Sequence, residues 1–191
     1  MKIGLFFGSF NPIHVGHLII ANTMAENTDL EEVWFVVSPQ NPFKKQKSLL
    51  HEFDRLDMVE KAIQDNYKLK TSDIEFHLPK PSYTIDTLTV LQEKHPEHEF
   101  GLIMGGDNLG HFKKWKNYDK ILEYFSLFVY PRPDSRPSEL DTHPKVHFVE
   151  APLMSISATF IRKCIKNKKS IRYLVPEAVD KYIEEKGFYQ S

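Results

Sequence analysis

The chain has 191 residues, 41% of them hydrophobic and 27% charged, which suits one domain with a substantial core. Its formal net charge of −1 argues against a protein that attracts nucleic acid or an acidic membrane through surplus positive charge, and no apolar stretch reaches the length of a membrane span or a signal peptide. The single cysteine, Cys164, excludes an internal disulfide framework and is typical of a reducing compartment, which predicts a cytoplasmic protein.

Apolar runs typical of buried strands alternate with segments of helical apolar spacing along most of the chain. Strands are predicted near residues 2–7, 32–37, 69–74, 99–104, 126–130 and 146–149. Helices are predicted over residues 15–27, 52–65, 84–95 and 118–124. This alternation predicts right-handed crossovers and a Rossmann-like α/β fold with a doubly wound parallel sheet. We expect residues 1–191 to form a single domain, whose C-terminal helical part (about 155–191) packs on the sheet.

The turn after the first strand, GSFNPIHVGH, carries the strongest chemical signal. A glycine turn that opens a helix directs backbone N–H groups at an anion. His14 and His17 are three positions apart and therefore share a helical face. Backbone donors and two imidazoles predict a phosphate site. A surface pair or a metal site is the alternative, although no cysteine or carboxylate lies near in sequence to complete a zinc set.

Two later segments are expected to face this turn. If the sheet reverses its order at the first strand, the fourth strand lies across the crevice where ligands bind, and it is followed by Gly106 and Asp107. Asp107 can accept hydrogen bonds from ribose hydroxyls, or it can cap a short helix. Near the C-terminus, Thr159 and Arg162 share one helical face, so a hydroxyl and a guanidinium can meet the same anion. The alternative is a capped helix whose arginine faces solvent.

These strings resemble the two signatures of the nucleotidylyltransferase superfamily. GSFNPIHVGH resembles its (H/T)xGH motif, related to the HIGH motif of class I aminoacyl-tRNA synthetases, and ISATFIR resembles its ISxTxIR motif. Within the superfamily, SYTIDTL, GGDN with FKKW, and YPRP are similar to segments of the bacterial nicotinate-nucleotide adenylyltransferases. The resemblance spans nearly the full chain. It implies transfer of AMP from ATP to nicotinate mononucleotide, giving deamido-NAD and pyrophosphate in NAD biosynthesis.

The resemblance also implies a set of site residues and partners. Catalytic roles are implied for His14, His17, Lys44 and Arg162. ATP binding is implied for Gly8, Ser9, Phe10, His14, Gly16, His17, Gly106, Asp107, Ser157, Thr159 and Arg162. Nicotinate mononucleotide binding is implied for Asn11, Tyr83, Thr84, Thr87, Trp115, Lys116 and Arg132. Mg²⁺ is expected to arrive with ATP, held mainly by phosphate and water and without protein ligands. We expect small-molecule partners only, with no nucleic acid and no membrane, and leave a homo-oligomer open.

Two positions depart from the family pattern. Phe43 stands where relatives often have a histidine, and Lys116 stands where some have a tyrosine, which leaves the Lys116 backbone as its candidate contact.

Two alternative functions remain open at this point. A pantetheine-phosphate adenylyltransferase shares both end signatures but needs neither the segment 83–87 nor Trp115. A non-catalytic nucleotide sensor on the same fold has no need to keep His14, His17 and Arg162.

Overall fold

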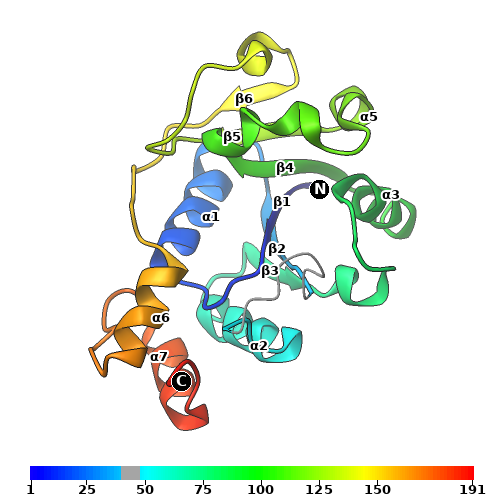
Figure 1. Ribbon diagram of the computed structural model, residues 1–191. Helices are drawn as coiled ribbons and strands as arrows, with labels where there is room; N and C mark the ends of the chain where they lie inside the picture. Colours follow the sequence, from blue (N-terminus) through cyan, green and yellow to red (C-terminus); the bar gives the residue numbers. More distant parts are fainter. Residues whose placement is uncertain (40–47) are drawn as a thin grey trace.

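The computed structural model describes residues 1–39 and 48–191. In these ranges the strands form one sheet, with the order β3-β2-β1-β4-β5-β6 and every neighbouring pair parallel. The strands are β1 (Lys2–Gly8), β2 (Glu32–Val37), β3 (Leu69–Ser72), β4 (Glu99–Gly105), β5 (Ser126–Tyr130) and β6 (Val146–Phe148). This is the doubly wound order, so the predicted α/β fold is confirmed (Figure 1).

The helices occur where the apolar spacing predicts them, with small differences at their ends. They are α1 (Val15–Asn27), α2 (Glu52–Ile63), α3 (Thr84–Lys94), α4 (Gly106–Leu109), α5 (Tyr118–Tyr124), α6 (Ala158–Lys166) and α7 (Glu177–Lys186). Three short 3₁₀ turns are η1 (Ile74–His77), η2 (Phe112–Lys114) and η3 (Glu139–Thr142). The third strand is shorter than predicted because η1 begins at Ile74. The proline-rich segment 131–144, predicted as a loop, contains η3.

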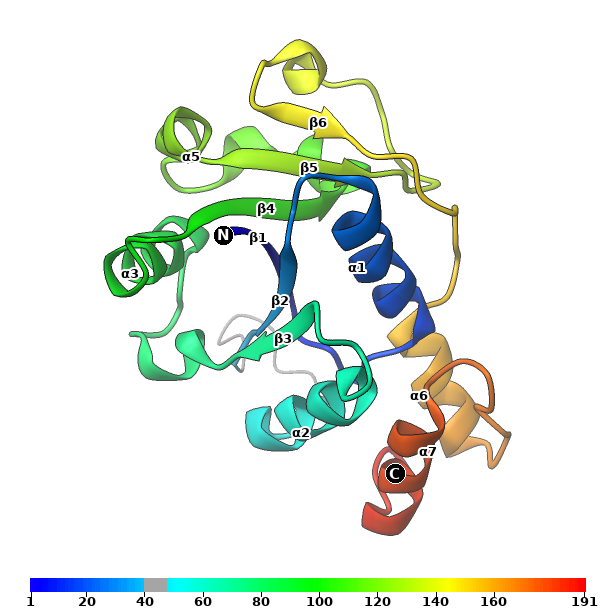
Figure 2. The ribbon, with the colours of Figure 1, turned by 180° about the vertical axis from the view of Figure 1, so that it is seen from behind.

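The sheet is covered on both faces, which explains its continuous apolar strands. One core cluster joins the sheet to α1, α2, α6 and α7, and the other joins it to α3 and α5. Figure 1 and the reverse view in Figure 2 show these two helical layers. Along β1 the side chains alternate between them: Ile3 and Leu5 belong to the second cluster and Phe6 to the first. None of the helices in the described ranges is long and apolar enough to cross a membrane.

The C-terminal helices contact the first half of the chain at several points. Ile161 of α6 and Val179 of α7 are fully buried in the first cluster. The Tyr182 hydroxyl donates a hydrogen bond to Oδ2 of Asp57 on α2, at 3.2 Å. The Val15 N–H at the start of α1 donates to the Leu174 carbonyl, at 2.9 Å. The last third of the chain therefore helps to position the start of α1.

Candidate active site

The sheet reverses its order at β1, which pairs with β2 on one side and β4 on the other. Beyond the carboxyl ends of these strands lies a cavity of about 280 Å³. The predicted site residues that line it are His14, Gly16, His17, Asp107, Arg132 and Ser157. The opening turn, the segment after β4 and the start of α6 thus meet at one cleft, although they are far apart in sequence.

The two histidines lie one above the other at the start of α1. Their ring centroids are 3.7 Å apart and the rings are nearly parallel. The backbone N–H of His14 donates to Nδ1 of His17, at 3.2 Å. Because Nδ1 accepts this hydrogen bond, the proton of a neutral His17 ring resides on Nε2. His17 therefore combines a helix-capping function with a free ring donor.

Burial keeps both imidazoles neutral. Desolvation, with a smaller contribution from the Arg132 charge, lowers the pKa of His14 to about 4. Desolvation also lowers the pKa of His17 well below its usual value, and the charges of His14 and Arg132 add to this effect. At neutral pH both rings are uncharged hydrogen-bond donors. An anion placed in the cleft would oppose these effects, because it favours the protonated form.

Gly16 is required by close packing against the histidine pair. A Cβ atom at this position would lie 2.8 Å from Cε1 and 2.9 Å from Nδ1 of His14. Any side chain here would therefore displace the His14 ring. Gly8 and Phe10 show the same kind of contact, since a Cβ at Gly8 would lie 2.9 Å from Cζ of the Phe10 ring. The Phe10 ring in turn packs edge-on against His17, with centroids 5.0 Å apart.

Asp107 and Arg132 come from neighbouring strands. Gly105, the last residue of β4, pairs with Tyr130 at the end of β5, which brings the two following segments together. A Cβ at Gly105 would lie 2.5 Å from Oδ1 of Asp107 and 2.7 Å from Cγ of Arg132. Gly106 and Asp107 begin the short helix α4, and Asp107 lines the cleft. The absence of a side chain at Gly105 leaves room for the Asp107 carboxylate and the aliphatic part of the Arg132 side chain.

Arg162 contacts the opening turn from the other end of the chain. Its Nη1 donates to the Asn11 carbonyl at 2.8 Å, and its Nη2 donates to Oγ1 of Thr159 at 3.2 Å. It does not line the histidine cleft but borders a neighbouring cavity with Ser48 and Tyr189. A phosphate contact by this guanidinium therefore requires it to exchange a protein partner for the ligand.

Ser157 lies at the start of α6, at the edge of the cleft. It is the N-cap of α6, and its Oγ accepts a hydrogen bond from the Phe160 N–H at 3.1 Å. It also lines the cleft that contains the histidines. The start of α6 therefore faces the site, where its backbone donors favour an anion.

Asn11 is placed differently from the prediction that it contacts nicotinate mononucleotide. Its side chain is buried: Nδ2 donates to the Ser48 carbonyl at 3.0 Å, and Oδ1 accepts from the Leu50 N–H at 3.3 Å and the Tyr189 hydroxyl at 2.6 Å. With the Arg162 contact to its carbonyl, Asn11 joins four separate segments. It is a positioning residue of the opening turn rather than a ligand contact.

The prediction for Thr87 is likewise corrected. Its side chain is fully buried, and its hydroxyl donates to Oε1 of Glu75 at 3.1 Å. Glu75 is itself buried, and this desolvation raises the pKa of its carboxyl. Because this side chain is fully buried and its hydroxyl faces Glu75 and the Tyr83 carbonyl, it does not reach a ligand at the surface. Thr87 instead fixes α3 against η1.

The other residues predicted for the nicotinate side gather at the start of α3. Tyr83 is 44% exposed, and Nζ of Lys116 lies 4.6 Å from the centroid of its ring. Trp115 is half-buried and packs on Phe112 with centroids 4.9 Å apart, and Thr84 is the first residue of α3. These residues do not line the histidine cleft. The predicted Lys44 and the departure at Phe43 lie outside the described residues.

Arg55 is a site residue that the sequence reasoning missed. It is fully buried on α2, where Nε donates to the Leu50 carbonyl at 2.8 Å and Nη1 donates to the carbonyls of Ser9 and Ser38 at 2.7 and 2.6 Å. It thereby joins the opening turn to the end of β2. The available signal was its position on the apolar stripe of the helix, three residues before Met58.

Comparison with known proteins identifies the family of the chain. A family model described as cytidylyltransferase-like matches residues 5–164. The chain is 64% identical over 191 residues to a probable nicotinate-nucleotide adenylyltransferase of Cytophaga hutchinsonii, covering 100% of each chain. It is 46% identical over 182 residues to the one of Bacteroides fragilis, covering 95% of this chain and 90% of the other. The structure of Plasmodium falciparum nicotinic acid mononucleotide adenylyltransferase complexed with NaAD has the same fold, with a TM-score of 0.83 at 23% identity and 98% and 97% coverage.

Proposed function

The chain belongs to the cytidylyltransferase-like family and, within it, to the nicotinate-nucleotide adenylyltransferases, and from this premise we propose that its histidine cleft transfers AMP from ATP to nicotinate mononucleotide. The products are deamido-NAD and pyrophosphate. The observation that carries the proposal is the meeting of His14, His17, Asp107 and Ser157 in one cleft at the reversal of the sheet order. Neutral ring donors and a helix start suit the phosphate oxygens of a nucleoside triphosphate, and the carboxylate can accept hydrogen bonds from its ribose hydroxyls.

The reaction requires alignment rather than a protein nucleophile. A phosphate oxygen of the mononucleotide attacks the α-phosphorus of ATP, the bond to the oxygen that bridges the α- and β-phosphates breaks, and pyrophosphate leaves with that electron pair. The attacking monoester is already anionic at neutral pH, so no general base is needed. Catalysis then consists of orienting the reactants and stabilising the charge that moves onto pyrophosphate.

We assign the ring donors of His14 and His17 to the triphosphate, with His17 nearest the bridging oxygen. Ser157, Thr159 and Arg162 bind the β- and γ-phosphate oxygens at the start of α6. Asp107 and the backbone of Gly8, Ser9 and Phe10 hold the adenosine. The family resemblance implies a nicotinate contact for Arg132, and its place beside His14 and His17 in the lining of the cleft also supports a contact to the phosphates.

The donor set of the cleft fits a Mg²⁺ ion that is held by the substrate. Among the described residues that line the cavity Asp107 is the carboxylate, and an ion that ATP brings would take its other ligands from phosphate and water. Bound with ATP, the ion would neutralise phosphate charge. The protein residues that act beside it are the ring donors of His14 and His17.

The nicotinate ring is assigned to the aromatic group at the start of α3. Trp115 offers a surface on which a pyridine ring stacks, and the first N–H groups of α3 at Thr84 are donors for its carboxylate. Tyr83 borders the same place. In this arrangement, the adenylyl and nicotinate halves of the product lie along the carboxyl edge of the sheet.

Replacing Trp115 with alanine is expected to raise the KM for nicotinate mononucleotide several-fold more than the KM for ATP, since a lost stacking contact costs about 0.5–1.5 kcal/mol. Steady-state kinetics with each substrate varied in turn measures the two constants. The matched control is Tyr124→Ala, which removes an aromatic side chain that is 65% exposed on α5 and should change neither constant. Equal increases in both constants for the Trp115 variant would instead assign this side chain to packing.

The activity itself is tested by incubating the protein with ATP, Mg²⁺ and one of three acceptors: nicotinate mononucleotide, nicotinamide mononucleotide or phosphopantetheine. We expect pyrophosphate release to be fastest with nicotinate mononucleotide. Fastest release with phosphopantetheine would identify the sibling enzyme instead. Binding of ATP without pyrophosphate release from any acceptor would indicate a nucleotide sensor.

We place this activity in the cytoplasm, with ATP and nicotinate mononucleotide as the partners. The lone, half-buried Cys164 supports a reducing compartment. The near-zero net charge supports small-molecule substrates rather than a polyanion such as nucleic acid.

A further inference from the structure

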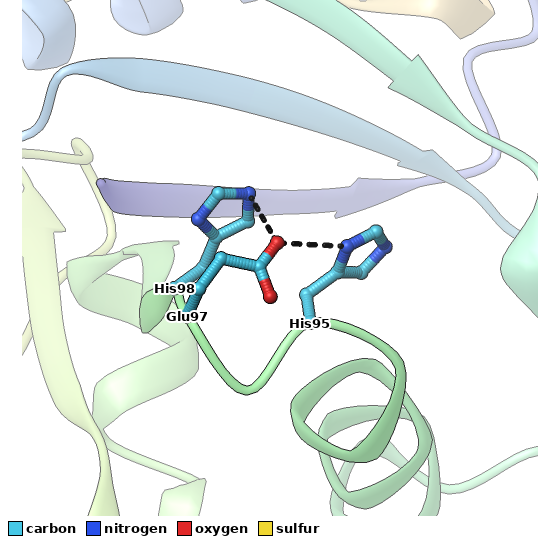
Figure 3. A group of neighbouring side chains, drawn as sticks. All are labelled: His95, Glu97 and His98. Carbon is cyan, nitrogen blue, oxygen red and sulfur yellow. Dashed lines mark ion pairs between the residues drawn. The ribbon is translucent and has the colours of Figure 1, made fainter.

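A second group of chemically active side chains lies at the opposite edge of the sheet from the cleft. His95, Glu97 and His98 belong to the short connection from α3 to β4, and Figure 3 shows their side chains converging. β4 begins directly after them, at Glu99, which pairs with Lys2 at the start of β1. Since all strands are parallel, this group lies at the amino-terminal edge of the sheet. It has no part in the adenylyl transfer proposed above.

The two distances from the carboxylate oxygen to the imidazole nitrogens are close to those of a tetrahedral metal site. Oε1 of Glu97 lies 3.6 Å from Nδ1 of His95 and 3.3 Å from Nε2 of His98, and all three atoms are within 4.8 Å of one another. Tetrahedral zinc has bonds of about 2.0–2.1 Å, which places neighbouring ligand atoms roughly 3.3–3.4 Å apart. Two imidazole nitrogens and one carboxylate oxygen also form a ligand set that zinc and similar divalent ions prefer.

The connection is held in this shape by its own hydrogen bonds. The His98 N–H donates to the His95 carbonyl at 3.0 Å, and Nε2 of Gln92 donates to the carbonyls of His95 and His98 at 3.4 and 3.0 Å. Both imidazoles pack edge-on against the Trp34 ring, with centroids 5.4 and 6.1 Å away. The backbone of the connection and the two imidazole rings are therefore ordered before any ion binds, which lowers the cost of assembling the site.

The exposure of the three side chains leaves one side open. The His98 side chain is 14% exposed and the Glu97 side chain is 61% exposed. Nδ1 of His98 faces the Met1 amino group at 3.5 Å, so Nε2 is the nitrogen directed at Glu97. An ion held here would be anchored from the protein side and would keep a position for water.

An ordinary ion pair explains the group less well. A simple ion pair joins two groups, whereas here one Glu97 oxygen and two imidazole nitrogens direct three possible ligand atoms at one point. Elsewhere, His77 and Asp73 form such a simple pair, at 3.3 Å on adjacent turns. We propose that His95, Glu97 and His98 bind a divalent transition-metal ion of the zinc type, with water as the fourth ligand.

The test is a calorimetric titration of metal-stripped full-length protein with Zn²⁺ alone, without nucleotide. We expect one ion per chain, and a melting temperature that rises with the Zn²⁺ concentration. His95→Asn and His98→Asn should each weaken binding at least about tenfold. Co²⁺ in place of Zn²⁺ should give the intense visible absorption of a tetrahedral site in the wild type and lose it in both variants.

Two further variants make the result specific. His77→Asn removes an imidazole from the simple ion pair and should leave Zn²⁺ binding unchanged. His17→Ala tests whether the catalytic pair is the real ligand. Any of three results would overturn the proposal: no one-to-one complex forms, Zn²⁺ binding is unchanged in His98→Asn, or Zn²⁺ binding is lost only in His17→Ala. Pyrophosphate release should be the same in His98→Asn and wild type, which separates this test from that of the enzymatic activity.

Discussion

Replacing His17 with alanine is expected to lower the kcat for pyrophosphate release by about 10²–10³-fold, as the loss of one oxyanion-hole donor does. The His17 ring is neutral, lines the cleft and has Nε2–H as its free donor, because its Nδ1 accepts the His14 N–H. Without this donor, charge that moves onto the bridging oxygen lacks a fixed partner. Steady-state turnover at saturating ATP and nicotinate mononucleotide measures the effect.

A glutamine at the same position separates catalysis from helix capping. His17 is the third residue of α1, where a glutamine side chain can also accept the N-cap N–H. His17→Gln should therefore retain the wild-type free energy of unfolding while its kcat is still reduced. Wild-type kcat in both variants would remove His17 from the mechanism.

The pH dependence of stability gives this experiment an independent readout. The pKa of His14 is lowered from 6.5 to about 4 on folding, so the unfolded chain binds a proton that the folded protein does not between these values. The free energy of unfolding should thus fall as the pH is lowered from 6.5 to 4, by on the order of 3 kcal/mol for His14. His17 contributes in the same direction, so His17→Ala should show a shallower decrease in chemical denaturation measured across this range.

Replacing Arg55 with methionine is expected to lower the free energy of unfolding by at least about 3 kcal/mol. The guanidinium is fully buried and donates to the carbonyls of Ser9, Ser38 and Leu50. Each hydrogen bond from a charged group contributes about 1.5–3 kcal/mol, and methionine leaves all three carbonyls without their donor. Urea denaturation of the two proteins measures the difference.

Two controls test whether the loss comes from this particular geometry. Arg55→Lys keeps the charge but lacks the planar fork, so it should recover only part of the stability. Arg136→Met changes an exposed arginine and should alter the free energy of unfolding by less than about 0.5 kcal/mol. Because Arg55 supports the Ser9 carbonyl, Arg55→Met should also reduce kcat. A stability loss below about 1 kcal/mol would show that the three carbonyls find other donors.

The layout of the fold was predictable because it depends on local and periodic signals. Apolar runs marked the strands, and apolar residues at helical spacing marked α1, α2, α3 and α5. The end of the third strand was misplaced because the 3₁₀ turn η1 begins at Ile74. Such short turns have no apolar periodicity that a sequence pattern could reveal. The position of the cleft followed from one topological rule, that ligands bind where the strand order reverses.

The individual contacts were less predictable, because they join segments that lie far apart in sequence. Asn11 was expected to meet a ligand, but Ser48, Leu50 and Tyr189 occupy its side chain. Thr87 was expected at the same ligand and is instead paired with Glu75. A residue type records which hydrogen bonds a side chain can make, and only the folded chain decides whether a ligand or another residue makes them.

The amino-acid sequence by itself determined the strand and helix order and the family of adenylyltransferases, and it predicted phosphate chemistry for the opening turn. These features depend on residue types at fixed short spacings, and such spacings can be identified without knowing which residues lie nearby in the folded chain. The tertiary structure alone decided that Arg132 lines the cleft with the histidines, that Arg55 supports the opening turn, and that His95, Glu97 and His98 converge. Such facts depend on burial and on distances between separate segments, and both are fixed only when the chain has folded.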